Sequence, residues 1–177
     1  LIGIRTTLLI SSVSMFYTFG VLYAMEVWGL SGSSWGAICA LSSLAHLLAI
    51  PLLPTLERAG LRTAYPAVLA LQACSMLVFS LGGFFPMLAG SVMLTVLGAC
   101  AYTVERALVA VETEKELRAR AESLMILSYS VGGSLGSAIG GCVYQLSPQS
   151  TFWVAAALQL MGALCAAAFI RPKQQAF

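Results

Sequence analysis

Long runs of apolar residues alternate with short polar connections along the whole chain. Six of these runs approach or exceed the roughly 20 predominantly apolar residues that a helix needs to cross a bilayer. Strands of a membrane barrel are shorter and alternate apolar with polar residues, which these continuous runs do not. The pattern therefore predicts an all-α, polytopic membrane protein with spans at residues 6–25, 34–56, 65–81, 84–104, 123–146 and 152–170.

The positively charged residues lie only in alternate connections between the predicted spans and at the ends of the chain. All nine Lys and Arg residues fall before the first span or after the second, fourth or sixth, and none falls in the other connections. Short loops rich in Lys and Arg stay in the cytoplasm. We therefore expect an integral, multi-pass protein of the plasma (inner) membrane. Both termini, the loop 105–122 and the tail 171–177 are expected to be cytoplasmic.

Composition narrows the class further. The chain is 9% charged and 59% apolar, whereas soluble domains average about 25% charged and 45–50% apolar. A soluble domain is therefore excluded, and so is a disordered chain, because disordered chains are poor in apolar residues. The five cysteines lie inside apolar runs without a CxxC pair, and there is one histidine. We expect no metal site and no disulfide framework.

Motifs of catalysis are not apparent in the sequence. It has no phosphate-binding GxxxxGK[ST] loop, no HExxH and no Ser–His–Asp arrangement. The basic residues follow the membrane topology rather than forming a patch for nucleic acid. We therefore expect neither an enzyme, nor a cofactor, nor a nucleic-acid partner, and the lipid bilayer is the first partner that the sequence indicates.

Small polar residues recur at steps of three and four within several spans, so they share one helix face. Two interpretations stay open: the faces line a polar pathway, or the hydroxyls bond their own backbone and hold neighbouring helices together. The clearest stripes are Thr7, Ser11, Ser14 and Thr18; Trp35, Cys39, Ser42 and His46; Ser91, Thr95, Gly98, Tyr102 and Glu105; and Ser123, Ser130, Ser134, Ser137, Gly141 and Tyr144.

Three ionisable residues in or beside the spans are candidates for function, because such residues are costly in a bilayer. Of these, Arg106 is interpreted as a cytoplasmic anchor. His46 lies in the middle of the second span, and an imidazole changes charge near neutral pH. Glu105 ends the stripe of the fourth span. The alternatives are a neutral, hydrogen-bonded His46 and a Glu105 that marks the water interface. Further candidates for substrate contact are Tyr17, Tyr102, Tyr129 and Ser134.

The fifth span carries glycines at Gly132, Gly136 and Gly140. A GxxxGxxxG spacing lets another helix approach closely. We expect these residues to serve helix packing, and the same contact would permit sliding in a protein that changes shape. Pro51 and Pro54 either end the second span or kink it, because proline lacks the N–H group of a regular helix.

The connection after the second span resembles the cytoplasmic signature G-x-x-x-D-R-x-G-R-R of the major facilitator superfamily. Glu57 stands at the acidic position, Arg58 at the first basic one, Gly60 at the glycine and Arg62 at the last basic one. The sequence departs from the pattern at Leu53 and Leu61. A long charged connection after the fourth span and a Gly-rich fifth span also match the family's order, so the resemblance covers essentially the whole chain.

This resemblance implies that the chain is the C-terminal six-helix half of a twelve-helix transporter. The stripes then fall on the four helices that line the family's central cavity, and the signature residues help to hold the inner gate. The implied function is secondary active transport of a small solute by alternating access, coupled to a proton, together with a missing N-terminal half.

The second span has Ala45-His46-Leu47 followed by Pro51, and the chain's end has Phe152-Trp153 and Arg171-Pro172-Lys173. These residues resemble the branch of lactose and phenylpropionate proton symporters, which has an acidic residue at the position of His46. Sugar-efflux and multidrug branches share the same loop pattern and stay open as alternatives.

Other classes of protein remain as alternatives. The chain is a piece of a longer protein on our interpretation, since it begins with Leu1 in an apolar stretch. A half-size transporter that dimerises, and a scaffold or receptor-like six-helix protein that does not transport, would show the same spans. Six further spans and a second signature loop upstream would distinguish the fragment from the half-size protein.

The orientation can be tested with single cysteines. We expect a cysteine at Gly83 or at Ser150 to react with a membrane-impermeant thiol reagent added outside the cell, because both positions lie in connections without basic residues. The unmodified chain measures the background from the native cysteines. Labelling of these two positions only from the cytoplasm would reverse the orientation.

Overall fold

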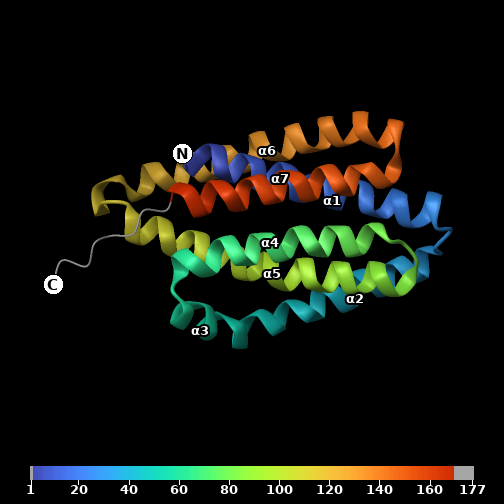
Figure 1. Cartoon of the computed structure of the whole chain (residues 1–177), viewed down its shortest axis with the longest axis horizontal. Coiled ribbons are helices and arrows are strands. Elements are labelled where there is room, and N and C mark those ends of the chain that lie inside the picture. The colour runs from blue at the N-terminus through green and yellow to red at the C-terminus, as the bar shows by residue number, and fades with distance from the viewer. Residues whose placement is uncertain (1, 170–177) are drawn as a thin grey trace.

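A computed structural model describes residues 2–169, and every regular element among them is helical. The bundle consists of long helices joined by short turns (Figure 1). The helices are α1 (Ile2–Leu22), continued by a π-helical turn (Tyr23–Val27); α2 (Gly32–Ala45); a 3₁₀ turn (His46–Leu48); α3 (Ala49–Ala59); α4 (Leu61–Ser80); α5 (Phe84–Glu112); a 3₁₀ turn (Lys115–Leu117); α6 (Arg118–Leu146); and α7 (Pro148–Phe169).

Six of the helical stretches within residues 2–169 are long and apolar enough to cross a membrane, which confirms the predicted all-α fold class. They are α1 with its π turn, α2 joined to α3, α4, α5, α6 and α7. Consecutive stretches run in opposite directions (Figure 1). All seven Lys and Arg residues of the described chain therefore lie toward one end of the bundle, which we call the basic end. The tail 171–177 lies outside the described residues.

The expected loop 105–122 is mostly helical. Helix α5 continues to Glu112 and α6 begins at Arg118, so only a short turn separates them. The helix continues because Leu108 and Val109 extend the apolar face of α5 and are buried. The Arg118 guanidinium donates to the Ala110 carbonyl at 2.7 Å, which satisfies an acceptor that the end of a helix otherwise leaves open.

The second span is bent rather than ended by its prolines. The α-helix changes to a 3₁₀ turn at His46–Leu48 and resumes as α3, which contains Pro54 and ends at Ala59. The ring of Pro51 would clash with the carbonyl of Leu47 in a regular helix, and its nitrogen donates no hydrogen bond there. A local 3₁₀ turn is a known response to such a conflict, so the bend is placed at His46.

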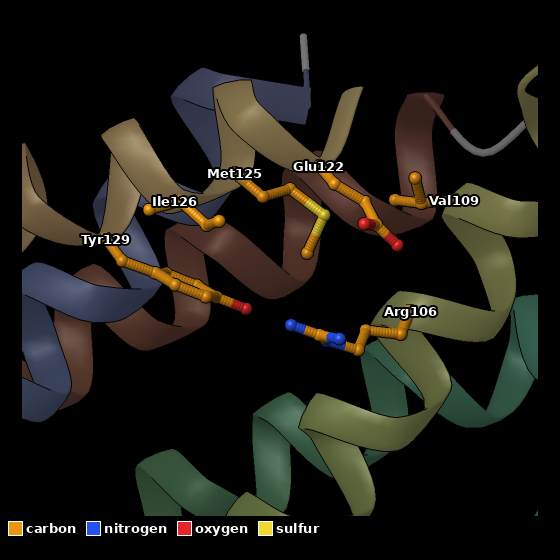
Figure 2. A pocket seen from close by; sticks show the side chains of 6 residues that line it. All are labelled: Arg106, Val109, Glu122, Met125, Ile126 and Tyr129. Atoms are coloured by element: carbon orange, nitrogen blue, oxygen red, sulfur yellow. The ribbon is translucent and has the colours of Figure 1, made fainter. Parts of the chain in front are cut away.

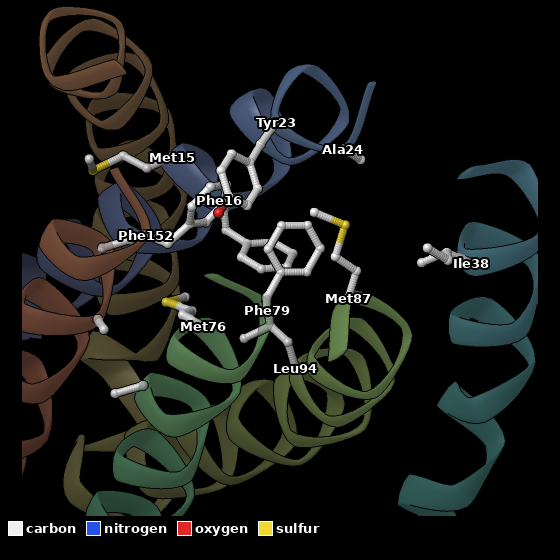
Figure 3. Packing of buried hydrophobic residues seen from close by; sticks show 13 residues of the cluster. Met15, Phe16, Tyr23, Ala24, Ile38, Met76, Phe79, Met87, Leu94 and Phe152 are labelled. Carbon is white, nitrogen blue, oxygen red and sulfur yellow. The ribbon is translucent and has the colours of Figure 1, made fainter. Parts of the chain in front are cut away.

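The order of neighbours across the bundle is α2, α5, α4, α7, α1 and α6 (Figure 1). Away from the basic end, aromatic rings from α1, α4 and α7 fill the core (Figure 3). Phe79 lies 4.6 Å from Phe16 and 5.0 Å from Phe152 between ring centroids. The Tyr23 hydroxyl donates to the Ser80 carbonyl at 2.8 Å. This half of the core is therefore mainly apolar, and the hydroxyl of its buried Tyr23 is hydrogen-bonded.

The turn between α4 and α5 needs glycine for two reasons. Gly82 has a φ of +77°, a conformation that residues with a side chain rarely adopt. A Cβ at Gly82 would also overlap the ring of Trp28. Trp28 follows the π turn of α1, so this contact joins the connection after α1 to the connection after α4 at the end opposite the basic one.

Glycines of α6 lie directly against α1. A Cβ at Gly132 would lie 2.7 Å from the Thr7 carbonyl oxygen, and one at Gly140 would lie 2.6 Å from the Phe19 ring. A Cβ at Gly136 would overlap the backbone of Ser11. Helices in lipid gain stability from such close backbone approach. Burial of apolar side chains gives no such gain, because lipid tails are as apolar as a neighbouring helix. These three residues therefore set the distance between α1 and α6.

We expect Gly136→Ala to lower the free energy of unfolding by about 1–3 kcal/mol, because the new methyl group forces α1 away from α6. Gly133→Ala is the matched control, since a Cβ at Gly133 meets nothing within 4 Å. Thermal unfolding of both variants in the same detergent measures the difference. Equal stability of the two variants would show that this contact does not hold the helices together.

Candidate functional site

An ion pair is buried between two helices near the basic end. The Arg5 guanidinium on α1 donates to Oε1 of Glu105 on α5 at 3.3 Å. The residues are 8% and 5% exposed, and both lie within the candidate membrane spans. Burying charges is costly unless they are paired and hydrogen-bonded. The pair therefore needs the support of its neighbours.

Three further side chains, from α1, α4 and α6, supply that support. The Thr6 hydroxyl donates to the same oxygen of Glu105 at 2.8 Å. The Tyr129 hydroxyl, on α6, donates to the other carboxylate oxygen at 3.3 Å. The Arg5 guanidinium lies 4.9 Å from the ring centroid of Tyr65 on α4, a favourable cation–π distance. Side chains from four helices thus meet around this ion pair.

A cavity of about 170 Å³ opens beside this carboxylate. Its walls come from α1, α4, α5, α6 and α7, so it lies inside the bundle. Most of the lining is apolar, and the polar groups gather at two levels. One level holds Tyr65, Tyr102, Glu105 and Tyr129, and the other holds Gln72 and Gln159. The arrangement can bind a small molecule that has both apolar and polar parts.

The structure brings together three of the residues that the sequence singled out. Glu105, Tyr102 and Tyr129 share this cavity. Tyr102 is half exposed, and the Arg106 guanidinium lies 4.7 Å from its ring centroid. Arg106 and Tyr129 point toward each other across a narrow space that Glu122 also borders (Figure 2). Its volume, about 10 Å³, suits one water molecule.

Other candidate residues lie elsewhere. His46 is exposed at the bend between α2 and α3. Tyr17 is 58% exposed and borders a separate space of about 60 Å³ between α1, α2 and α5. Ser134 is exposed, and its hydroxyl donates to the Ser130 carbonyl at 3.0 Å. The structure therefore does not gather these three residues with Glu105.

The residues of the signature pattern form the turn between α3 and α4. Gly60 is the single residue between the two helices and has a φ of +87°, which explains a glycine there. Its N–H donates to the Glu57 carbonyl at 3.1 Å. Arg58 is exposed and Arg62 is half-buried. This turn lies at the basic end, in a different element from the ion pair.

The hydroxyl stripes of the first and fifth spans face each other in part. The Ser14 hydroxyl donates to the Gly133 carbonyl at 2.9 Å and lies 3.0 Å from the Ser137 hydroxyl. Ser11 instead donates to the Thr7 carbonyl of its own helix at 2.8 Å. In these residues the polar stripes hold α1 to α6 or bond their own backbone, as hydroxyls in membrane helices often do.

Sequence reasoning missed five polar residues of the site: Arg5, Thr6, Tyr65, Gln72 and Gln159. Arg5 was counted as a cytoplasmic flank of the first span, whereas it is buried against Glu105. One signal was available. Arg5 and Glu105 carry opposite charges and lie at the same end of two antiparallel helices. Opposite charges at equal depth in two spans indicate an ion pair. Gln72 and Gln159 are the strongly polar residues in the middle of their spans.

These features define a helical membrane protein with a polar, charge-compensated site inside its spans. The sequence matches the family model of the Major Facilitator Superfamily over residues 5–176, nearly the whole chain, and the chain belongs to that family. Its members are membrane transporters, so the chain has a transport function in general terms. No curated protein matches the sequence.

The ion pair can be tested by a double-mutant cycle. Arg5→Met or Glu105→Gln leaves one buried charge unpaired, and each is expected to lower the free energy of unfolding by about 3–5 kcal/mol. The double variant is expected to regain much of this loss, because it buries no charge. Arg106→Met is the control, since Arg106 is exposed. Additive losses in the double variant would show that the two residues do not interact.

Proposed function

We propose that this protein moves a small solute across the membrane by alternating access, in exchange or together with a proton, and that Glu105 carries the proton. The buried pair of Arg5 and Glu105 is the observation that carries the proposal. Ionisable residues inside membrane spans commonly mark ion or substrate pathways. The adjoining cavity of about 170 Å³ offers room for a solute beside the carboxylate.

The geometry supports a specific coupling step. The Glu105 carboxylate joins α5 to α1 through Arg5 and Thr6, and to α6 through Tyr129. A proton bound to the carboxylate removes the charge that holds Arg5, and it takes one acceptor position away from the donors around it. Protonation therefore loosens α5 from α1 and α6. A proton then changes which helix arrangement is favoured, as a coupled transporter requires.

His46 is the second residue in this proposal. It lies exposed at the bend of the α2–α3 span, where a change of charge would act on a helix junction. Tyr17 and Ser134, which lie on exposed faces of α1 and α6, are proposed to contact the solute from outside the Glu105 cavity. Glu57, Arg58, Gly60 and Arg62 are proposed to act in gating at the basic end.

The topology belongs to the same proposal. We place the basic end in the cytoplasm, with a second six-helix half opposite the exposed faces of α2, α5 and α6. Supporting this, seven Lys and Arg residues lie toward one end of the described bundle, and short basic connections remain cytoplasmic. The glycine contact between α1 and α6 is a surface along which helices can shift during a change of access.

The test is proton movement driven by a solute. The full-length protein is reconstituted in vesicles that hold a pH-sensitive dye, and lactose, other sugars, phenylpropionate and neutral aromatic alcohols are added in turn. We expect at least one solute to change the internal pH. Glu105→Gln is expected to abolish proton movement, because a carboxamide does not take up a proton as a carboxylate does. Exchange of labelled solute across the membrane is expected to remain.

His46→Ala is measured in parallel, and Ser134→Ala is the control for an exposed hydroxyl bonded to its own helix. Solute uptake that depends neither on a pH gradient nor on Glu105 and His46 would refute proton coupling. Absence of any solute movement by the folded, full-length protein would refute transport and favour a scaffold or receptor-like role.

A further inference from the structure

A buried amide pair closes the cavity at the level away from Glu105. The Gln159 amide nitrogen on α7 donates to the Gln72 amide oxygen on α4. The two residues are 1% and 3% exposed. The other atom of the Gln159 amide, its Oε1 oxygen, is buried and accepts no hydrogen bond from residues 2–169. A buried acceptor without a donor is costly, so the pair is one donor short.

The space next to this amide pair is kept open by a glycine. Gly98 on α5 lines the cavity, and a Cβ there would lie 3.6 Å from the Gln72 amide nitrogen. A longer side chain at this position would fill the space in front of the pair. An incoming molecule therefore meets the Gln159 oxygen, an acceptor, close to the Gln72 nitrogen, a donor. A hydroxyl or a carboxamide group satisfies both.

The charges of the cavity favour an uncharged occupant. Glu105 is the charged residue in the lining, and its carboxylate already accepts hydrogen bonds from Arg5, Thr6 and Tyr129. A cation would compete with Arg5 for this carboxylate, and an anion would have no positive partner in the lining. Since a charge buried without a partner is costly, a neutral molecule is the better fit.

The size and the walls favour an organic molecule over water. A volume of about 170 Å³ equals roughly five or six water molecules at about 30 Å³ each. Between the amide pair and the carboxylate, however, the walls are apolar: Leu9, Ile10, Val13, Leu69 and Ala101. Waters there would lack the two to four polar partners that buried waters need. An apolar body fills this stretch better.

We propose that the cavity binds a small, uncharged amphiphile, with a hydroxyl or carboxamide group on Gln72 and Gln159 and an apolar body reaching toward Tyr102 and Tyr129. The proposed transport already places a solute in this cavity beside Glu105, so this inference rests on that proposal and adds the amide pair as the contact that selects the solute. Binding here requires neither a proton gradient nor movement of a solute, so it can be measured separately.

Binding is followed by ¹⁹F NMR on the purified full-length protein in detergent. The probes are 4-fluorobenzyl alcohol and 4-fluorobenzamide, with 4-fluorobenzylammonium and 4-fluorotoluene as charged and apolar counterparts. We expect saturable binding of the alcohol and the amide, and weaker binding of the ammonium. Gln159→Leu is expected to weaken alcohol binding by about tenfold, the effect of one lost neutral hydrogen bond, and to leave toluene binding unchanged.

Gly98→Leu is expected to abolish binding of all four probes, because the side chain fills the cavity. Gly36→Leu is its matched control, since a Cβ at Gly36 meets nothing within 4 Å. If Gln159→Leu does not fold, the double variant Gln72→Leu/Gln159→Leu replaces it, because it removes both amides together. Alcohol binding that survives in folded Gly98→Leu, or an ammonium that binds as tightly as the alcohol, would overturn the proposal.

Discussion

A chain in lipid must satisfy its polar groups within itself, because the hydrocarbon offers no hydrogen bonds. The arrangement of this bundle follows from that constraint. The Glu105 carboxylate collects donors from α1 and α6, and the Tyr23 hydroxyl reaches the carbonyl of Ser80 on α4. Each such contact ties one helix to another. Polar contacts therefore help to set where the helices of this protein lie.

Close backbone approach makes these polar contacts possible. Gly136 lies against Ser11, and Gly90 lies against Ser75 and Phe79, so α6 and α4 each meet a neighbour with little intervening side chain. Apolar burial does not favour one helix neighbour over lipid, whereas tight contact does. The small residues set which helices touch, and the buried polar residues set how those helices are turned about their axes.

Apolar run length was enough to predict the spans and the fold class, because length and hydropathy are properties of single segments. Contacts between segments were not predictable in this way. Glu105 ended the apolar run and was taken as the edge of a span, yet α5 continues past it because Leu108 and Val109 are buried. Its partner Arg5 lies 100 residues earlier, and no local pattern joins the two. A kink in the second span was foreseen as one of two effects of Pro51 and Pro54, but its position at His46–Leu48 was not.

The separation of Arg5 and Glu105 also bears on how the protein is made. A chain is synthesised from its N-terminus, so α1 reaches the bilayer long before α5 exists. An unpaired arginine is costly within the hydrocarbon and tends to remain near the headgroups. Arg5 therefore gains its buried partner only when α5 delivers the carboxylate. The buried position of an arginine in the first span thus depends on the fourth span.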